Sequence, residues 1–68
     1  MTDPDLYVAA AEATGESHRG LALRVLGVDE RTGRRWRSGE SPIPEPVRRL
    51  LCVLIRYPKI ARELSAAR

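Results

Sequence analysis

Apolar residues recur at intervals of three or four along most of this chain, the spacing that places side chains on one face of an α-helix. The four stretches are Leu6, Ala9, Ala10 and Ala13; Leu21, Ala22, Val25 and Leu26; Val47, Leu50, Leu51 and Leu54; and Ile60, Ala61 and Leu64. No stretch shows the alternation typical of a half-buried strand. The pattern predicts an all-α protein, a small bundle of about five helices, of which residues 30–38 form the most polar.

Capping residues, glycine and proline mark where these helices should begin and end. The expected N-caps are Thr2 or Asp3, then Ser17 and Asp29, and the expected stops are Gly15, Gly27 and Gly39. Residues 42–46 contain three prolines and form a stiff connector. Either Pro44 or Pro46 can occupy the first turn of the next helix, which runs to about Tyr57.

Residues 17–39 combine two short helix patterns with a tight turn at Gly27. In the second helix, Thr32, Gly33 and Trp36 share one side, while Arg31, Arg34 and Arg35 fall on the other. One side therefore packs against the protein and the other presents guanidinium groups. The residues expected to form the core of this unit are Leu23, Leu26, Val28, Gly33 and Trp36.

The run LGVDERTGRRWRSGESPIPEPVRRLL resembles the helix-turn-helix of phage Cro and lambda-repressor type regulators. The shared features are the Leu-Gly-Val turn at 26–28, an aromatic residue at Trp36 and a glycine at Gly39. The resemblance covers residues 17–57. It implies that residues 29–38 lie in the major groove of double-stranded DNA and that the chain is a small transcriptional regulator, a repressor.

Two positions depart from the family's pattern. Four residues before the turn glycine, Gly27, the family usually has Ala, and this chain has Leu23. Six residues after that glycine the family usually has Val or Ile, and this chain has Gly33. In the family these two side chains touch where the helices cross. We expect Leu23 to fill the space left by Gly33, because a volume-conserving exchange is tolerated best at a packed crossing. The alternative is that Gly33 only loosens its helix.

The DNA contacts follow from side-chain chemistry. Arg31, Arg34 and Arg35 are the expected base-reading residues, because a guanidinium can pair in bidentate fashion with guanine. Phosphate contacts set register rather than sequence. The expected phosphate-binding residues are Ser17, Arg19, Thr32, Arg37 and Ser38. Ser17 and Arg19 are included because, in the resembling family, the start of the first of the two helices lies against the DNA backbone.

Charge is distributed unevenly along the chain, although the net charge is only +3. Residues 1–16 carry four acidic residues and no Lys or Arg, whereas residues 17–39 carry six arginines against Asp29 and Glu30. A basic block on one helical hairpin is typical of a protein that binds a polyanion. The acidic first helix, by contrast, should lie on the face away from DNA.

Length and composition limit the remaining choices. A chain of 68 residues forms one small domain, here residues 1–68, with a thin core. A single cysteine, Cys52, makes no internal disulfide and favours a reduced, cytoplasmic protein. The first residues are acidic, unlike a signal peptide, and the longest apolar run, Leu50 to Ile55, is too short to span a membrane.

More than one side of the helix at 45–57 is apolar, which favours a homodimer formed through residues 44–68. The candidate interface residues are Val53, Tyr57, Ile60 and Leu64. Alternatively, residues 58–68 cover this second side within one chain. A twofold pair would also explain binding to two half-sites about one DNA turn apart.

Other function classes are weaker. The chain has one histidine, His18, and so offers no ligand set for a metal and no base–nucleophile pair. It also has no glycine-rich phosphate loop. We therefore expect that the chain is not an enzyme and that it uses no cofactor and no small-molecule substrate. The chief rival is a protein-binding adaptor or antitoxin-like modulator on a helix-turn-helix scaffold, because a fold alone does not define function.

Overall fold

The computed structural model describes residues 1–66, which contain helices and no strand. The helices are α1 (Asp3–Thr14), α2 (His18–Gly20), the π-helical turn η1 (Leu21–Leu26), α3 (Glu30–Ser38), α4 (Glu45–Arg56) and α5 (Ile60–Ala66). Leu21 keeps right-handed helical angles, so α2 and η1 form one continuous helix. The prediction of an all-α bundle of about five helices is confirmed.

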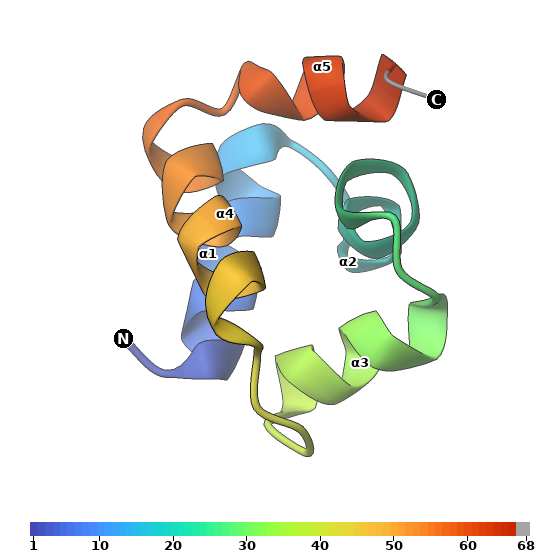
Figure 1. Ribbon diagram of the computed structural model, residues 1–68, viewed down its shortest axis with the longest axis vertical. Helices are drawn as coiled ribbons and strands as arrows, with labels where there is room; N and C mark the ends of the chain where they lie inside the picture. The colour runs from blue at the N-terminus through green and yellow to red at the C-terminus, as the bar shows by residue number, and fades with distance from the viewer. Residues whose placement is uncertain (67–68) are drawn as a thin grey trace.

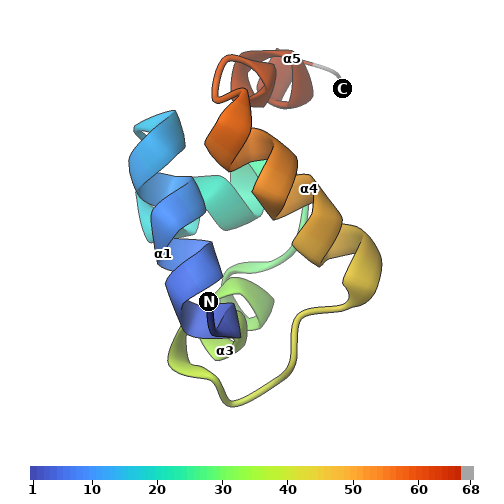
Figure 2. The same ribbon diagram turned by 90° about the vertical axis from the view of Figure 1, so that its left-hand side faces the viewer.

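The helices are arranged around one side-by-side pair (Figure 1). α1 and α4 lie next to each other and run in the same direction, with their outer sides facing the viewer in Figure 2. α3 crosses the end at which both helices begin, and α5 crosses the end at which both finish. The continuous helix α2–η1 packs between α3 and α5 on the opposite side. The outer side of α3 therefore lies at one end of a molecule that measures 29 × 22 × 20 Å.

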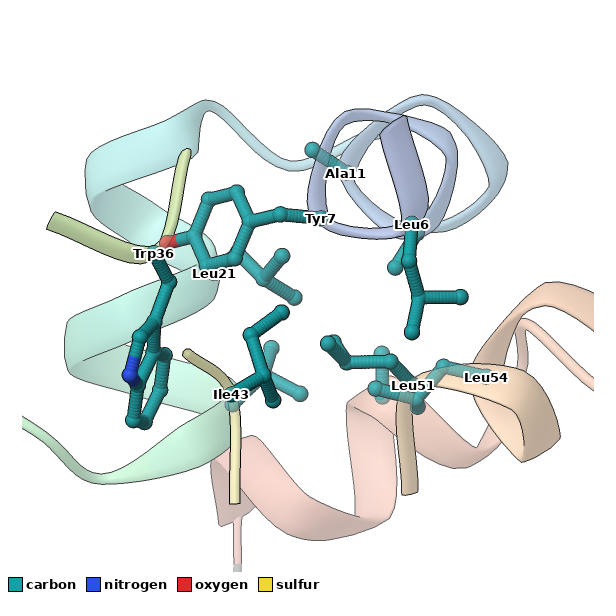
Figure 3. Close-up of a cluster of buried hydrophobic side chains, with 11 residues drawn as sticks. Leu6, Tyr7, Ala11, Leu21, Trp36, Ile43, Leu51 and Leu54 are labelled. Atoms are coloured by element: carbon teal, nitrogen blue, oxygen red, sulfur yellow. The ribbon is translucent and has the colours of Figure 1, made fainter. Parts of the chain in front are cut away.

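The core is a single cluster of apolar side chains between these helices (Figure 3). The largest fully buried side chains are Tyr7, Leu21, Leu51 and Leu54, and Trp36 and Ile43 close one side of the cluster. Among residues 1–66, no charged or polar side chain other than the Tyr7 ring is buried. Folding therefore depends on the packing of a small number of apolar groups.

The predicted caps are confirmed. The side-chain oxygens of Thr2, Ser17 and Asp29 accept hydrogen bonds from the backbone N–H groups of Asp5, Gly20 and Thr32. Each of the three helices is followed by a left-handed glycine: Gly15, Gly27 and Gly39, with φ of 74°, 71° and 84°. Helix α4 begins at Glu45, with Pro44 as its N-cap and Pro46 in its first turn. Local capping chemistry is therefore sufficient to place these boundaries.

The buried face of α1 differs from the predicted one. Its buried residues are Leu6, Tyr7, Ala10 and Ala11, whereas Ala13 is exposed and Ala9 is only half-buried. Alanines occupy so much of this helix that their spacing alone does not distinguish one face from the next. The Tyr7 ring decides the face, because an aromatic ring buries more apolar surface than any alanine.

The largest difference concerns Leu23, which was expected in the core and is instead 38% exposed. The cause is the π-helical turn of η1, in which the N–H of Gly27 donates to the carbonyl of Ala22, five residues earlier. A π turn contains about one residue more than an α turn. The residue that faces Gly33 is therefore Ala22, five positions before the turn glycine, and the expected pairing of Leu23 with Gly33 is wrong.

The other expected core residues of this unit are buried to different degrees. Gly33 and Trp36 are buried, and Leu26 and Val28 are half-buried and pack against the main cluster. The neighbouring α5 packs its Ile60 and Leu64 against the same cluster. Residues 58–66 therefore cover part of the apolar surface within one chain.

A hydrogen bond and a salt bridge between distant residues hold the proline-rich connector and the start of α4 against α1. The carboxylate of Asp3 accepts a hydrogen bond from the backbone N–H of Ile43 at 2.8 Å and contacts the guanidinium of Arg48. The first turns of α1 and α4 are therefore held beside each other. This contact joins residues 40 and 45 positions apart, so helix periodicity gives no indication of it.

Candidate nucleic-acid interface

The candidate interface is built on α3, a helix of nine residues that starts at a strong cap. The Asp29 carboxylate accepts from both the backbone N–H and the hydroxyl of Thr32. These hydrogen bonds, chiefly that from the Thr32 hydroxyl, lower the pKa of Asp29 below its ordinary value. Asp29 is therefore charged at neutral pH, at the end of the helix where the dipole favours a negative group.

The inner side of α3 fits closely against α1 and η1. A Cβ atom at position 33 would lie 2.6 Å from the Cβ of Ala22 and 2.8 Å from the hydroxyl oxygen of Tyr7. Both distances are too short for a real contact, so glycine is required at this crossing for steric reasons. One turn later, the Trp36 ring is buried beside Ile43 (Figure 3). These contacts fix which side of α3 faces solvent.

The outer side of α3 carries the three arginines expected to contact bases. Arg31, Arg34 and Arg35 are all exposed, and they line one shallow hollow together with Arg37, Ser38 and Glu40. Among the described residues, neither Arg31 nor Arg34 forms a salt bridge, and Arg35 lies 4.0 Å from the carboxylate of Glu40. The structure therefore brings the three predicted side chains together on one accessible surface.

A second, smaller hollow lies between the start of α2 and α3. It is lined by His18, Arg19, Glu30, Gly33, Arg34 and Arg37. Arg19 lies 3.5 Å from the Glu30 carboxylate, and a guanidinium nitrogen of Arg37 lies 2.9 Å from Nδ1 of His18. Because arginine only donates, this ring nitrogen of His18 acts as the acceptor. Two of the residues predicted to bind phosphate, Arg19 and Arg37, thus lie on the side of the interface next to α2.

The three hydroxyl residues predicted to bind phosphate serve local backbone contacts. Ser17 accepts from Gly20, and the Thr32 hydroxyl donates to Asp29. The Ser38 hydroxyl donates to the carbonyl of Arg35 at 3.2 Å. Each hydroxyl is therefore held in place at an end of its helix.

Sequence reasoning missed the role of Tyr7. Its hydroxyl donates a hydrogen bond of 2.7 Å to the backbone carbonyl of His18, linking α1 to the start of α2. The rings of Tyr7 and His18 also meet edge to face, with centroids 6.2 Å apart. Burial raises the pKa of Tyr7, and the nearby positive charge of Arg37 acts in the opposite direction. The signal available in the sequence was a single large aromatic residue in an alanine-rich helix.

The described part of the chain contains no group of three or more His, Cys, Asp or Glu residues arranged to hold a metal ion. None of its helices has the length and apolar content needed to cross a membrane. Cys52 is exposed and unpaired on α4.

A comparison with family models, curated proteins and solved structures finds no match for the chain. The resemblance to phage regulators therefore stays a prediction.

Proposed function

We propose that the chain binds double-stranded DNA in a sequence-specific manner and acts as a small transcriptional regulator, a repressor that occupies its operator. The observation that carries this proposal is the exposure of Arg31, Arg34 and Arg35 on one side of a short helix whose other side is held by Gly33 and Trp36. A helix fits the width of the major groove, and guanidinium groups recognise guanine O6 and N7 there.

The residues around α3 have different parts in this proposal. Arg31 and Arg34 contact base edges without first losing a salt bridge to a described residue, whereas Arg35 must exchange Glu40 for DNA. Arg19 and Arg37 lie beside the second hollow, where a phosphate group would compete with Glu30 for Arg19. Ser17, Thr32 and Ser38 complete the proposed backbone contacts. The proposal includes two copies of the chain on two half-sites.

In-vitro selection from a pool of random duplexes tests the proposal directly. We expect enrichment of a motif containing guanines, and a loss of affinity of about 1–3 kcal/mol for each base-contacting arginine replaced by alanine. In Arg34→Ala, Arg35→Ala the preference at the corresponding base pairs should relax. Arg62→Ala is the matched control, because Arg62 is exposed on α5, away from α3.

Salt dependence provides the second readout. Contacts with several phosphates release counterions, so the affinity of the parent protein should fall steeply between about 50 and 200 mM salt. An unselected pool, or unchanged DNA affinity in Arg34→Ala, Arg35→Ala, would refute the proposal.

A protein-binding adaptor is the second candidate. It is favoured by two exposed apolar side chains, Val53 on α4 and Tyr57 at its C-cap, which are 41% and 54% exposed. Binding that survives moderate salt and the loss of Arg34 and Arg35, but not of Val53 and Tyr57, would favour this function over DNA binding.

A further inference from the structure

The outer surface of α1 carries an acidic stripe with an apolar centre. Its buried residues lie on one side of the helix, so Asp5 and Glu12, which are exposed, and Val8 and Ala9, which are half-buried, share the opposite side. Among the described residues, neither Asp5 nor Glu12 forms a salt bridge, in contrast to Asp3 and Glu16. We call residues 5, 8, 9 and 12 the acidic stripe.

The outer surface of α4 carries the opposite charge with the same layout. Leu51 and Leu54 face the core, and the exposed residues on the far side are Arg49, Cys52, Val53 and Arg56. Arg49 contacts Glu45, and Arg56 lies over the ring of Tyr57, so both guanidinium groups remain at the surface. We call residues 49, 52, 53 and 56 the basic stripe.

The two stripes match in spacing. Each has a charged residue, then two mainly apolar positions three and four residues later, then a second charged residue seven residues after the first. Residues with this spacing fall on one face of a helix. The acidic stripe is therefore complementary to the basic stripe in charge and in the position of its apolar centre.

The two stripes also begin near the same end of the molecule, because Asp5 is the third residue of α1 and Arg49 is the fifth residue of α4. α1 and α4 are neighbours that run in the same general direction, inclined to each other, and present their outer sides to the viewer of Figure 2. The contacts of Asp3 with Ile43 and Arg48 hold the start of α1 beside the start of α4. A twofold axis running along these helices would keep each residue at its height while exchanging the positions of α1 and α4.

We propose that this α1–α4 surface binds a second copy of the same chain. The acidic stripe of each copy lies on the basic stripe of the other, so that Asp5 faces Arg49 and Glu12 faces Arg56 across the interface. The twofold axis repeats each of these two contacts, once for each copy. Val8 and Ala9 meet Val53 at the centre, where apolar contact adds to the charge attraction. A second copy fits this surface because the chain itself carries both halves of the complementary pattern.

The proposed interface differs from one formed by α4 and α5, because Ile60 and Leu64 pack on the core of their own chain. It also has a geometric consequence for α3. Since the axis runs along α1 and α4, and α3 crosses the end where both begin, the two α3 helices lie at the same end of the pair. The proposal does not rest on the proposed function, because the experiment that tests it follows association without DNA.

The experiment uses charge reversal and sedimentation at several protein concentrations. One variant carries Asp5→Arg and Glu12→Arg, and the other carries Arg49→Glu and Arg56→Glu. In each variant both stripes have the same sign, so we expect self-association at least ten-fold weaker than in the parent. An equimolar mixture of the two variants should associate again, because each then offers the stripe that the other lacks.

Two controls make the outcome specific. Arg31→Glu with Arg62→Glu changes the net charge as much as the second variant does but lies on α3 and α5, so it should associate like the parent. Circular dichroism of every variant should show the helical content of the parent. A parent chain that is monomeric at several hundred micromolar, or a mixture that stays monomeric, would overturn the proposal.

A cross-link tests the register independently. Val8→Cys should form an interchain disulfide with the natural Cys52 under mild oxidation, giving a dimer band that reducing agent removes. Arg62→Cys is the control and should not form that band more readily than the parent. Equal cross-linking of Val8→Cys and Arg62→Cys would contradict the assigned surface.

Discussion

At the scale of single residues, the contact around Gly33 determines how closely α3 approaches the rest of the protein. The expectation from sequence was that Leu23 compensates for the missing side chain. The structure places Ala22 and the Tyr7 hydroxyl there and leaves Leu23 at the surface. The two positions should therefore respond to substitution independently and very differently.

Gly33→Ala is expected to lower the free energy of unfolding by about 1–3 kcal/mol, because the new methyl group overlaps Ala22 and Tyr7. This expected loss already includes the helix propensity of alanine, which favours the helix by about 1 kcal/mol over glycine. Leu23→Ala should cost about 1 kcal/mol or less, because the side chain is partly exposed. Urea unfolding of both variants checks this, and a larger loss for Leu23→Ala than for Gly33→Ala would contradict the structure.

Tyr7→Phe tests the link between α1 and α2. Loss of the hydroxyl removes one of two donors to the carbonyl of His18, which keeps the backbone N–H of Leu21, and we expect a loss of about 0.5–1.5 kcal/mol at neutral pH. Because the pKa of Tyr7 is raised on folding, its neutral form contributes stability below the unfolded pKa of about 10, and this contribution is lost as pH rises through the folded pKa. The difference in stability between parent and variant should therefore shrink above about pH 10, whereas a difference that is constant with pH would argue against a buried neutral Tyr7.

At the scale of elements, the ends of the helices could be predicted from the sequence, but the π-helical turn of η1 could not. Caps and stop glycines act within a few residues, so Ser17, Asp29 and Gly27 indicated their boundaries correctly. The π turn of η1 was missed because the apolar pattern was interpreted with α-helical spacing. One extra residue then moves every predicted contact before Gly27, which is why Leu23 was placed in the core.

This explanation predicts the effect of a deletion. Removing Leu23 shortens η1 by the residue that the π turn accommodates, so that Ala22 would precede the turn glycine by four positions, as in an α-helix. We expect the deletion variant to fold, with helical content and a cooperative melting transition like those of the parent. Deleting Cys52 from α4 is the control, because the following residues would rotate away from the core by about 100°. A Leu23 deletion as disruptive as the Cys52 deletion would show that the π turn is not an insertion.

At the scale of the whole molecule, contacts between distant residues carried most of the information that sequence patterns lacked. The Asp3 contacts with Ile43 and Arg48 join residues 40 and 45 positions apart, and the Tyr7 contact joins α1 to α2. The grouping of Arg31, Arg34 and Arg35, however, was predictable, because it needs only one helix and one buried side. The complementarity of α1 and α4 became apparent only when both helices were placed on the same side of the molecule.

The tight crossing at Gly33 also determines how the outer surface of α3 can be redesigned. The outward positions 31, 34 and 35 can be randomised as a library without disturbing the scaffold, provided that Gly33 and Trp36 are retained. Replacing the whole of α3 by a helix of another sequence would fail wherever that sequence carries a branched side chain at the position of Gly33. Changes to the outer surface of α3 should therefore be made one side chain at a time on the existing helix.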